Sequence, residues 1–509
     1  MFSKVKSCGI IGIDGYLIDV ETDIDEKEGT FDIVGLGDTA VKEARERVRA
    51  AIKNSNFEFP DNKITVNLAP ANVRKEGSLL DLPIALGILG AQGKIKLDNI
   101  GEYVFVGELS LNGEIKPIKG SLSMSIKCLK ENIKKIVVPY ENAREAGVVK
   151  GVEVLPIRNI LEIINHLNDV ETIIPYRVEI ENWFTEDVPY DVDFSDVKGQ
   201  PMAKRALEVA ASGGHNCLLI GSPGSGKTML AKRLPTILPP LTFEESLEVT
   251  KIHSIAGTLD INKSLIVTRP FRSPHHTISN IALIGGGKYP KPGELSLAHY
   301  GVLFLDEVPE FSKLALEVLR QPLEDGNISI SRVNGSVVYP AKTTLICAAN
   351  PCKCGNYLDE KVPCTCTQRQ VSQYMSRLSG PLLDRIDIQI EMSSVKYKDL
   401  NDTKAEETSQ EIRKRVIKTR EIQLERYKNM NIFSNSQLNG RYLNKFCKLD
   451  DNCKALLKNA FDKLNLSARA YSRILKLSRT LADMDGQENI TQNNIAEAIQ
   501  YRSLDRKRK

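Results

Sequence analysis

Short runs of apolar residues that end in polar residues or glycine recur in the second part of the chain. The clearest are residues 217–220, 301–305 and 343–349, which are almost entirely apolar. Strands that are buried on both faces of a parallel sheet have this composition. The first run is followed at 229–234 by a pattern typical of a helix. The pattern predicts an α/β unit with a parallel sheet.

The first 170 residues have a different pattern, in which β-like runs at 9–13, 63–68 and 103–107 alternate with helical segments. Residues 41–52 are apolar at positions 41, 44, 48 and 52, which predicts an amphipathic helix. A compact α+β domain is expected here. Residues 328–339 alternate by twos around Asn334-Gly335, which is a strong signal for a β-hairpin.

These patterns divide the chain into four parts. Residues 1–170 are expected to form the α+β domain, and 171–195, with acidic residues and prolines, a linker. The α/β part is expected over 196–395. Residues 396–509 are rich in Lys, Glu, Asn and Leu and predict a helical C-terminal part. A length of 509 residues fits several domains.

Composition narrows the function classes only a little. The chain has no run of eighteen apolar residues and no secretory signal, so we expect a cytoplasmic protein without a membrane span. Its formal net charge of +4 neither requires nor excludes nucleic acid as a partner. A positively charged surface that binds DNA would therefore have to be confined to one part of the protein.

A phosphate-binding loop is the most specific motif in the chain. It matches G-x-x-x-x-G-K-[ST] with Gly221, Ser222, Pro223, Gly224, Ser225, Gly226, Lys227 and Thr228, between a predicted strand and a predicted helix. The glycines allow backbone N–H groups to surround an anion at the start of the helix. Lys227 is expected to reach the β- and γ-phosphates of ATP, and Thr228 to bind Mg²⁺.

Two carboxylates at the end of the next apolar run indicate hydrolysis in addition to binding. Asp306 and Glu307 follow this run about eighty residues after the loop. Asp306 is expected to hold Mg²⁺, and Glu307 to act as general base on the attacking water. Asn350, at the end of the third run, is expected to orient that water. Arg385 lies further along and is a candidate arginine finger, the alternative being an ion pair with Asp384 or Asp387.

Four of the ten cysteines are clustered, and they are Cys352, Cys354, Cys364 and Cys366. Two C-x-C pairs separated by nine residues can provide four thiolates to one tetrahedral Zn²⁺. The spacing predicts a structural zinc site, with redox-active thiols or an iron–sulfur cluster as alternatives. The remaining cysteines are single and read as small apolar residues.

The order of these motifs resembles the AAA+ ATPases: phosphate loop, acidic strand end, polar sensor, arginine finger and helical lid. The resemblance implies that residues 196–200, including Gln200, line the adenine pocket. It implies that Arg385 acts on nucleotide held by a neighbouring subunit, so that the protein works as an oligomer. Arg469 lies where related lids place an arginine that reaches the γ-phosphate, and Arg473 is the competing candidate.

Residues 80–87 and 107–120 resemble the protease domain of Lon, a fold similar to ribosomal S5 domain 2. Lon uses a Ser-Lys dyad, but its two positions fall on Leu79 and Leu122, which cannot perform the chemistry. A dyad shifted to Ser78 and Lys119 is a remote alternative. The expected fold is therefore an α/β AAA+ P-loop core with a helical lid, preceded by a degenerate Lon-protease-like α+β domain.

Over nearly the whole chain, the sequence resembles the magnesium-chelatase-like AAA+ family called ComM or YifB. The resemblance is carried by Lys75–Ser78 with Asp81–Pro83, and by segments 270–277, 292–299, 350–355 and 467–473. It implies an ATP-hydrolysing hexameric helicase that promotes branch migration during recombination of transforming DNA. Implied partners are single-stranded and branched DNA, further copies of the chain, and recombination or DNA-uptake proteins.

In the branch of AAA+ proteins that holds the chelatases, hairpins facing a central pore follow the phosphate loop. This resemblance makes Lys288, Lys291 and Arg332 candidate contacts to DNA, with solvated turn charges as the alternative. His275 and His276 are expected to serve packing or turn roles. Two other functions stay open: a chelatase-like ATPase that remodels a protein partner for metal insertion, and a Lon-like ATP-dependent protease, which Leu79 and Leu122 disfavour.

Overall fold

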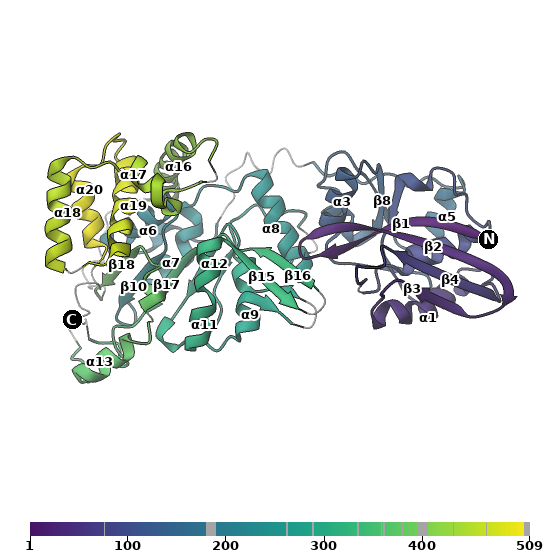
Figure 1. Ribbon diagram of the computed structural model, residues 1–509, viewed down its shortest axis with the longest axis horizontal. Helices are drawn as coiled ribbons and strands as arrows, with labels where there is room; N and C mark the ends of the chain where they lie inside the picture. Colours follow the sequence, from purple (N-terminus) through teal and green to yellow (C-terminus); the bar gives the residue numbers. More distant parts are fainter. Residues whose placement is uncertain are drawn as a thin grey trace. The chain divides into compact units, whose positions relative to one another are not determined.

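The computed structural model describes residues 1–75, 77–179, 190–260, 263–287, 290–332, 335–357, 359, 362–378, 380–394, 406–430, 432–464 and 466–502. The described residues form two compact units (Figure 1). Unit 1 consists of Met1–Glu186, Thr242–Val267 and Ser329–Tyr339. Unit 2 consists of Asp187–Leu241, Thr268–Ile328 and Pro340–Lys509. Two segments of the expected α/β part therefore belong to unit 1.

Unit 1 is built from alternating strands and helices. Its strands are β1 (Phe2–Ile11), β2 (Asp14–Glu28), β3 (Phe31–Val34), β4 (Asn62–Ala69), β5 (Tyr103–Phe105), β6 (Glu108–Leu109), β7 (Ile115–Lys116), β8 (Lys135–Pro139) and β9 (Glu153–Ile157). Its helices are α1 (Thr39–Asn54), α2 (Asp81–Ala91), α3 (Ser121–Lys130), α4 (Ala143–Ala146), α5 (Ile160–Leu167) and α8 (Phe243–Ala256), with 3₁₀ turns at Ile100–Glu102 and Tyr140–Asn142.

The amphipathic helix expected at 41–52 is confirmed as α1. The Asp38 side chain accepts a hydrogen bond from the backbone N–H of Val41, which starts the helix. The apolar positions 41, 44, 48 and 52 are buried, as the spacing predicts. Helix α2 is different, because all of its residues are buried and it is apolar on every side. Such a helix lies inside a core and shows no amphipathic period.

The strands of unit 1 form separate sheets. The larger sheet has the order β1-β2-β4-β3, in which only the β3–β4 pair is parallel. Strands β5, β8 and β9 form a parallel sheet. A shared hydrophobic core contains side chains from β2, β4, α1, α2 and α5, among them Val20, Leu68, Val48, Leu86 and Ile163.

Helix α8 follows the phosphate-loop helix in sequence but packs within unit 1. Phe243 and Leu247 of α8 contact the cluster that contains Leu122 and Val148. The Ser254 hydroxyl donates to the Glu145 carboxylate at 2.6 Å. The same hydroxyl accepts from the backbone N–H of Gly120 at 2.8 Å. These contacts make residues 242–267 a structural part of the N-terminal unit.

Unit 2 carries the parallel sheet that the apolar runs predict. The strands of this sheet are β10 (Cys217–Gly221), β11 (Phe271–Arg272), β14 (Val302–Leu305), β17 (Thr344–Ala349) and β18 (Ile388–Met392). Strands β12 (Gly285–Gly286) and β13 (Lys291–Pro292) form a separate antiparallel pair. Strands β15 (Asn327–Arg332) and β16 (Gly335–Pro340), most of whose residues belong to unit 1, pair with each other, which confirms the expected hairpin. Its turn, 333–334, lies outside the described residues.

The helices of unit 2 lie around this sheet and in a C-terminal group. They are α6 (Pro201–Gly213), α7 (Lys227–Ile237), α9 (Asn280–Ile284), α10 (Glu294–Leu297), α11 (Lys313–Val318), α12 (Arg320–Asp325), α13 (Gln368–Met375), α14 (Gly380–Leu383), α16 (Ser409–Arg426), α17 (Gly440–Phe446), α18 (Asp451–Leu464), α19 (Ala468–Met484) and α20 (Gln492–Gln500), with 3₁₀ turns at Phe194–Asp196, Val308–Glu310 and Asn435–Gln437.

The sheet order β11-β14-β17-β10-β18 places the strand before the phosphate loop between two others. All pairs are parallel, with Ile220 opposite Ala349 and Leu305 opposite Cys347. Residues that follow β10, β14 and β17 therefore meet at one edge. Ligands of open α/β sheets bind outside the carboxyl ends of the strands.

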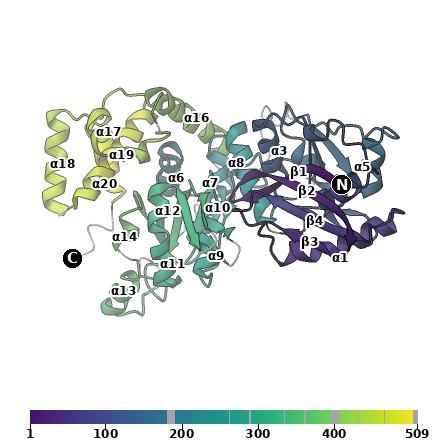
Figure 2. The same cartoon turned by 45° about the vertical axis from the view of Figure 1, so that its right-hand side comes forward.

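Helices α17 to α20 gather beyond α16, as Figure 2 shows. One hydrophobic core joins this helical group to the sheet, since it contains Leu219 and Phe304 from strands together with Val416, Ile474 and Leu481 from helices. Where the chain is described, no helix is both long and apolar enough to cross a membrane.

Candidate nucleotide site

The phosphate loop connects the carboxyl end of β10 to the first residue of α7. Gly224 and Gly226 have φ angles of +78° and +90°, a region that other residues adopt only with strain. A Cβ atom on Gly221 would lie 2.7 Å from the carbonyl oxygen of Met392 in β18. The glycines of the motif are thus required by backbone conformation and by close packing. The loop opens onto the N-terminal end of α7, where an anion is stabilised.

Lys227 lies inside this loop, and it is only 8% exposed. Its ammonium donates to the carbonyl oxygens of Gly221 at 2.7 Å and Ser222 at 3.0 Å. Burial lowers the pKa of Lys227, and the carboxylates of Asp306 and Glu307 oppose that shift. A buried ammonium within a ring of backbone dipoles is suited to pair with phosphate oxygens.

Thr228 and Asp306 provide a hydroxyl oxygen and a carboxylate oxygen, and Mg²⁺ prefers oxygen ligands of these kinds. The Thr228 hydroxyl donates to the Asp306 carboxylate at 2.8 Å, although β14 and α7 are far apart in sequence. Hydroxyl and carboxylate oxygens beside phosphates are typical ligands of Mg²⁺ in nucleotide sites. The donor set present here fits that ion.

Glu307 follows Asp306 at the sheet edge and has a side chain that is 52% exposed. Its backbone lies in the left-handed region, with φ of 50°, and its N–H donates to the Asp306 carboxylate at 3.0 Å. The His276 Nδ1 atom is 3.8 Å from a Glu307 carboxylate oxygen. Nothing in the sequence pointed to a contact between His276 and this carboxylate, because His275 and His276 were expected to serve packing or turn roles.

Asn350 and Gln200 both contact the phosphate loop. The Asn350 side-chain oxygen accepts from the Lys227 ammonium at 3.3 Å. The Gln200 amide donates to the carbonyl oxygens of Ser225 at 3.2 Å and Ser393 at 2.7 Å. Both residues proposed from motif order are therefore next to the loop.

Arg385 is held on its own unit and is not part of this cluster. Its guanidinium donates to the carbonyl oxygen of Arg320 at 2.9 Å and pairs with the Glu324 carboxylate at 2.7 Å. The alternative partners named from sequence, Asp384 and Asp387, bind other arginines. The Glu324 contact had no sequence signal, because α12 lies about sixty residues earlier.

The two lid arginines at the start of α19 differ in their surroundings. Arg473 donates to Asp387 at 2.7 Å and has a side chain that is 15% exposed. Arg469 donates to Asp384 at 2.5 Å from a side chain that is 73% exposed. Arg473 is committed to a buried contact, whereas Arg469 is accessible.

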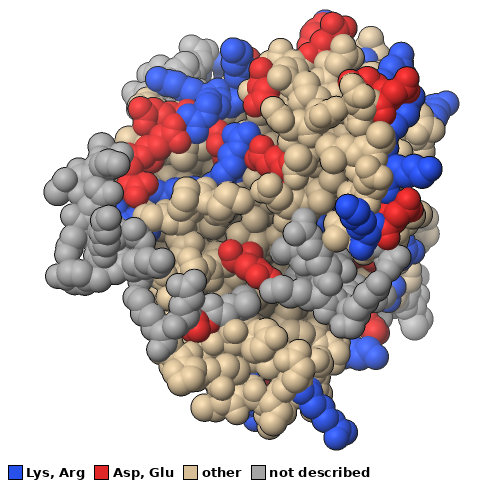
Figure 3. Space-filling view, turned by 90° about the vertical axis from the view of Figure 1, so that its left-hand side faces the viewer, with Lys and Arg blue, Asp and Glu red and all other residues tan. Residues whose placement is uncertain are grey.

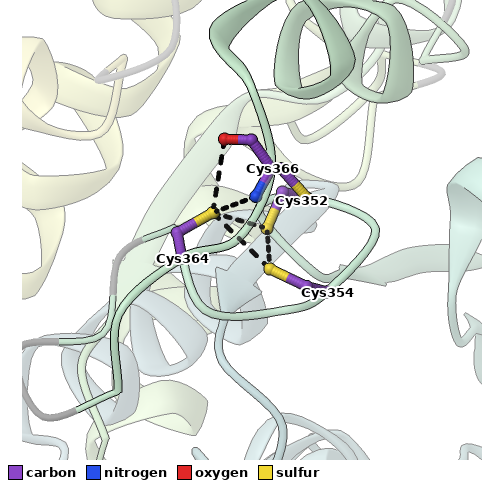
Figure 4. Close-up of side chains that lie close together, drawn as sticks. All are labelled: Cys352, Cys354, Cys364 and Cys366. Carbon is purple, nitrogen blue, oxygen red and sulfur yellow. Dashed lines mark hydrogen bonds between the residues drawn. The ribbon is translucent and has the colours of Figure 1, made fainter.

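The four clustered cysteines converge, as Figure 4 shows. Sγ–Sγ distances are 3.3 Å from Cys352 to Cys354, 3.7 Å from Cys352 to Cys364, and 3.5 Å from Cys354 to Cys364. The Sγ atom of Cys366 lies within 4.8 Å of the other three. The group follows Asn350 directly, so it is part of the loop that leaves β17 at the nucleotide edge.

Comparisons with known proteins agree with this geometry. A family model described as magnesium chelatase subunit ChlI matches residues 193–400, a second ChlI model matches 20–142, and a ChlI C-terminal model matches 406–502. The chain is 41% identical over 503 residues to competence protein ComM of Haemophilus influenzae, covering 98% of this chain and 97% of the relative. It is also 41% identical over 508 residues to YifB of Escherichia coli, covering 99% and 97%.

The chain belongs to the ComM/YifB family of magnesium-chelatase-like proteins. The parallel sheet of this family member, with its phosphate loop, is an α/β P-loop ATPase core. The chain is also similar in part to Lon protease 2 of Bacillus subtilis, with 26% identity over 186 residues that cover 33% of each chain.

The structure shows no dyad at the Lon-like positions of this family member. Leu122 is fully buried and its backbone N–H donates to Glu145. The Ser78 hydroxyl donates to Glu108, whereas the Lys119 side chain lies beside Gly257. Within the described residues, no contact joins Ser78 to Lys119.

The candidate DNA contacts of this family member are placed only in part. Lys291 is exposed in β13, which pairs with β12 as a short hairpin. Arg332 is the last residue of β15, but its side chain lies outside what the structure describes, and so does the whole of Lys288.

Proposed function

We propose that this protein is an ATP-hydrolysing, hexameric DNA motor that promotes branch migration during recombination of transforming DNA. The observation that carries the proposal is the joining of Lys227, Thr228 and Asp306 at one sheet edge, with Glu307 next along the chain. A relative of nearly full length is named a competence protein, and competence is the uptake of DNA by cells. ATP and Mg²⁺ in the cytoplasm are the expected substrate and cofactor.

The proposed roles at the site follow from position and chemistry. Lys227 binds the β- and γ-phosphates, Thr228 and Asp306 hold Mg²⁺, and Gln200 borders the adenine side. Glu307 takes the proton from the attacking water as general base, and Asn350 orients that water. Mg²⁺ supplies charge neutralisation at the phosphates. Arg469 contacts the γ-phosphate from the lid.

Hydrolysis in this proposal needs a second subunit. Arg385 lies outside the cluster formed by the phosphate loop and Asp306 and contacts Arg320 and Glu324, which supports the proposal that it acts on nucleotide bound by a neighbour. An arginine finger supplied in this way is worth about 10³–10⁵ in rate. The assembly we propose is a ring of six copies.

DNA contact is assigned to the hairpins that carry Lys291, Arg332 and Lys288. On the face shown in Figure 3, basic and acidic side chains of the described residues are interspersed, and they are not gathered by sign. A net charge of +4 agrees with contact through a few local groups. Phosphate contacts of this kind are independent of base sequence and weaken with salt. Recombination or DNA-uptake proteins are the expected partners.

The test is ATP turnover by the purified protein with and without single-stranded and branched DNA. We expect stimulation by DNA that is lost in Glu307→Gln, followed by branch migration on a mobile junction. Lys291→Ala is expected to weaken binding equally on all sequences and to reduce its dependence on salt. Turnover that ignores DNA at low salt contradicts the motor proposal.

A second function has a specific observation in its favour. The family models that match residues 20–142, 193–400 and 406–502 are all named for a magnesium-chelatase subunit. This favours an ATPase that remodels a protein partner for metal insertion. Metal–porphyrin turnover on addition of chelatase subunits, together with indifference to DNA, would select it. The Lon-like alternative predicts casein cleavage, which Leu79 and Leu122 disfavour.

The third bound group in the proposal is one Zn²⁺ held by Cys352, Cys354, Cys364 and Cys366. Thiolates are preferred ligands of this ion, and four of them without an open position form a structural site. The convergence of the four sulfur atoms supports it.

A further inference from the structure

The spacing of the sulfur atoms fits one tetrahedrally bound ion better than a disulfide or a cluster of several iron atoms. Tetrahedral Zn²⁺ with Zn–S bonds of about 2.3 Å places its sulfur atoms roughly 3.8 Å apart. The observed distances of 3.3–3.7 Å are close to that spacing. They are much longer than the S–S bond of about 2.05 Å in a disulfide. A cluster of several iron atoms would hold its thiolates farther apart.

The backbone around the sulfur atoms also fits a metal centre. The N–H of Cys366 lies 3.4 Å from the Sγ atom of Cys364, and the N–H of Gly355 donates to the carbonyl oxygen of Cys352 at 3.0 Å. Cys352 is fully buried. N–H groups directed at thiolate sulfur and tight turns at the ligands stabilise bound metal.

The cysteine loop packs directly on the phosphate loop. Gly355 has φ of +86°, and a Cβ atom there would lie 2.6 Å from the Cδ atom and 2.8 Å from the Cγ atom of Pro223. The backbone of Gly355 is therefore in contact with the proline ring. Pro223 is one of the residues that form the turn between β10 and α7.

A second connection runs through Asn350. This residue is two positions before Cys352, and its side chain accepts from the Lys227 ammonium. The loop is thus tied to the phosphate loop at Pro223 by packing and at Lys227 by a hydrogen bond. After Cys366, Thr367 caps α13, and the chain leads through α14 toward Arg385.

We propose that the thiolate-bound Zn²⁺ braces the phosphate loop, so that loss of the ion weakens binding of ATP. This inference rests on the zinc site proposed above. In the absence of the ion, the sulfur atoms are joined only by weak contacts, and the loop regains conformational freedom. Gly355 then no longer holds Pro223, and Asn350 no longer holds Lys227. Ordering of the loop would have to be supplied by ATP itself, which lowers affinity.

The first experiment establishes the ion. Metal analysis of purified protein is expected to give about one zinc per chain, since four thiolates make one closed site. Cys352→Ser and Cys364→Ser are expected to lose it, whereas Cys128→Ala, a buried thiol in α3, is expected to keep it. Replacement by Co²⁺ should give the visible absorption of a tetrahedral thiolate complex. Protein that carries no zinc and binds none overturns the site itself.

The second experiment tests the brace by titration with a fluorescent ATP analogue, in the presence of Mg²⁺. Removal of zinc, or Cys352→Ser, is expected to raise the Kd about tenfold, the effect of losing one good contact. Returning Zn²⁺ to the stripped wild-type protein should restore the Kd. Zinc that is lost with an unchanged Kd overturns the brace and leaves the site intact.

Gly355→Ala tests whether the contact between Gly355 and Pro223, independently of zinc content, affects ATP binding. The new methyl group meets Pro223, so we expect zinc to stay bound while the Kd rises several-fold. Gly486→Ala is the matched control, because Gly486 has φ of +68° and nothing within 4 Å of its Cβ position. Thermal unfolding of both variants checks that they are folded. Equal Kd values for the two variants overturn the contact to Pro223 as the route of coupling.

Discussion

At the residue scale, Glu307, the proposed general base, has an unusual backbone conformation that orients its side chain. A left-handed φ of 50° is costly for a glutamate, by about 1–3 kcal/mol, and is kept only where neighbouring structure enforces it. Here the Glu307 N–H donates to the Asp306 carboxylate, and the Glu307 carbonyl oxygen accepts from the N–H of Glu310. The result is a carboxylate turned out from the sheet edge beside His276.

Glu307→Gln is expected to bind ATP normally and to hydrolyse it more slowly by about 10²-fold or more, since an amide cannot accept the proton of water. Nucleotide binding and steady-state turnover measure the two effects. Glu310→Gln is the control, because Glu310 pairs with Arg377 nearby. Unchanged turnover in Glu307→Gln removes this residue as the base.

Asp81 provides a second residue-scale prediction, in unit 1. Its carboxyl is fully buried, and burial raises its pKa to about 6, although two hydrogen bonds from Arg47 oppose the shift. An unfolded Asp has a pKa of about 3.9, so between these values the folded chain binds a proton that the unfolded chain does not. The contribution to stability is therefore complete below about pH 4 and is lost as the pH rises through 6.

The measurement is thermal unfolding of wild type and Asp81→Asn at pH 5 and pH 7. The advantage of wild type over the variant is expected to be larger at pH 5. An advantage that shrinks on acidification would show that the Arg47 pair keeps Asp81 charged in the folded protein.

Motif spacing was enough to predict which residues lie together at the edge of the sheet, because a phosphate loop needs particular residues at fixed positions. Lys227, Thr228 and Asp306 are examples. Spacing could not predict Glu324 as the partner of Arg385, because that contact depends on how α12 packs. The Lys227–Asn350 hydrogen bond joins the start of α7 to the residue after β17, and the sequence could not predict it either.

At the element scale, a buried polar network joins the sheet to the lid. Asp387, just before β18, accepts from Arg473 of α19 at 2.7 Å and contacts His215 Nδ1 at 2.9 Å. The other ring nitrogen of His215 is 2.8 Å from the Thr480 hydroxyl in α19. Burial alone would raise the pKa of Asp387, but the His215 hydrogen bond and the Arg473 charge hold it well below its usual range. The Asp387 carboxylate is therefore ionised, and it connects Arg473 of α19 to His215.

Asp387→Ala is expected to destabilise unit 2 by about 3–5 kcal/mol, because it leaves Arg473 and His215 buried without their anion. Asp384→Ala removes the partner of the exposed Arg469 and should cost about 0–1 kcal/mol. Thermal or urea unfolding compares the two. Similar losses for both variants would contradict a structural role for the network.

Local patterns predicted elements better than their partners. The hairpin β15–β16 and helix α1 follow from alternation and from helical spacing, which are properties of single segments. The packing of α8 in unit 1 could not be predicted in this way. Apolar residues such as Phe243 and Leu247 indicate that a helix face is buried, but not which element covers it. Helix α2, which is buried on every side and apolar apart from Asp81, similarly has no period from which its position could be derived.

At the scale of the whole molecule, the proposed ring requires that the site of one chain be completed by a second. Arg385 is 15% exposed and paired with Glu324, so it makes no contact with its own phosphate loop in the structure described. To serve a neighbour, it must exchange Glu324 for the γ-phosphate. The proposed ring can therefore be tested with mixtures of two inactive variants, because each variant supplies the residue that the other lacks.

Lys227→Ala is expected to lose nucleotide binding but keeps Arg385, whereas Arg385→Ala keeps the phosphate loop but lacks the proposed finger. Each variant alone should lose about 10³-fold or more in turnover. In an equal mixture, roughly a quarter of the interfaces join an intact loop to an intact finger, if subunits of the symmetric ring assort at random. Turnover should therefore recover to a similar fraction of wild type. A mixture of Lys227→Ala with the double variant has no intact loop and should stay inactive. If the first mixture also stays inactive while the subunits exchange, Arg385 does not act between subunits.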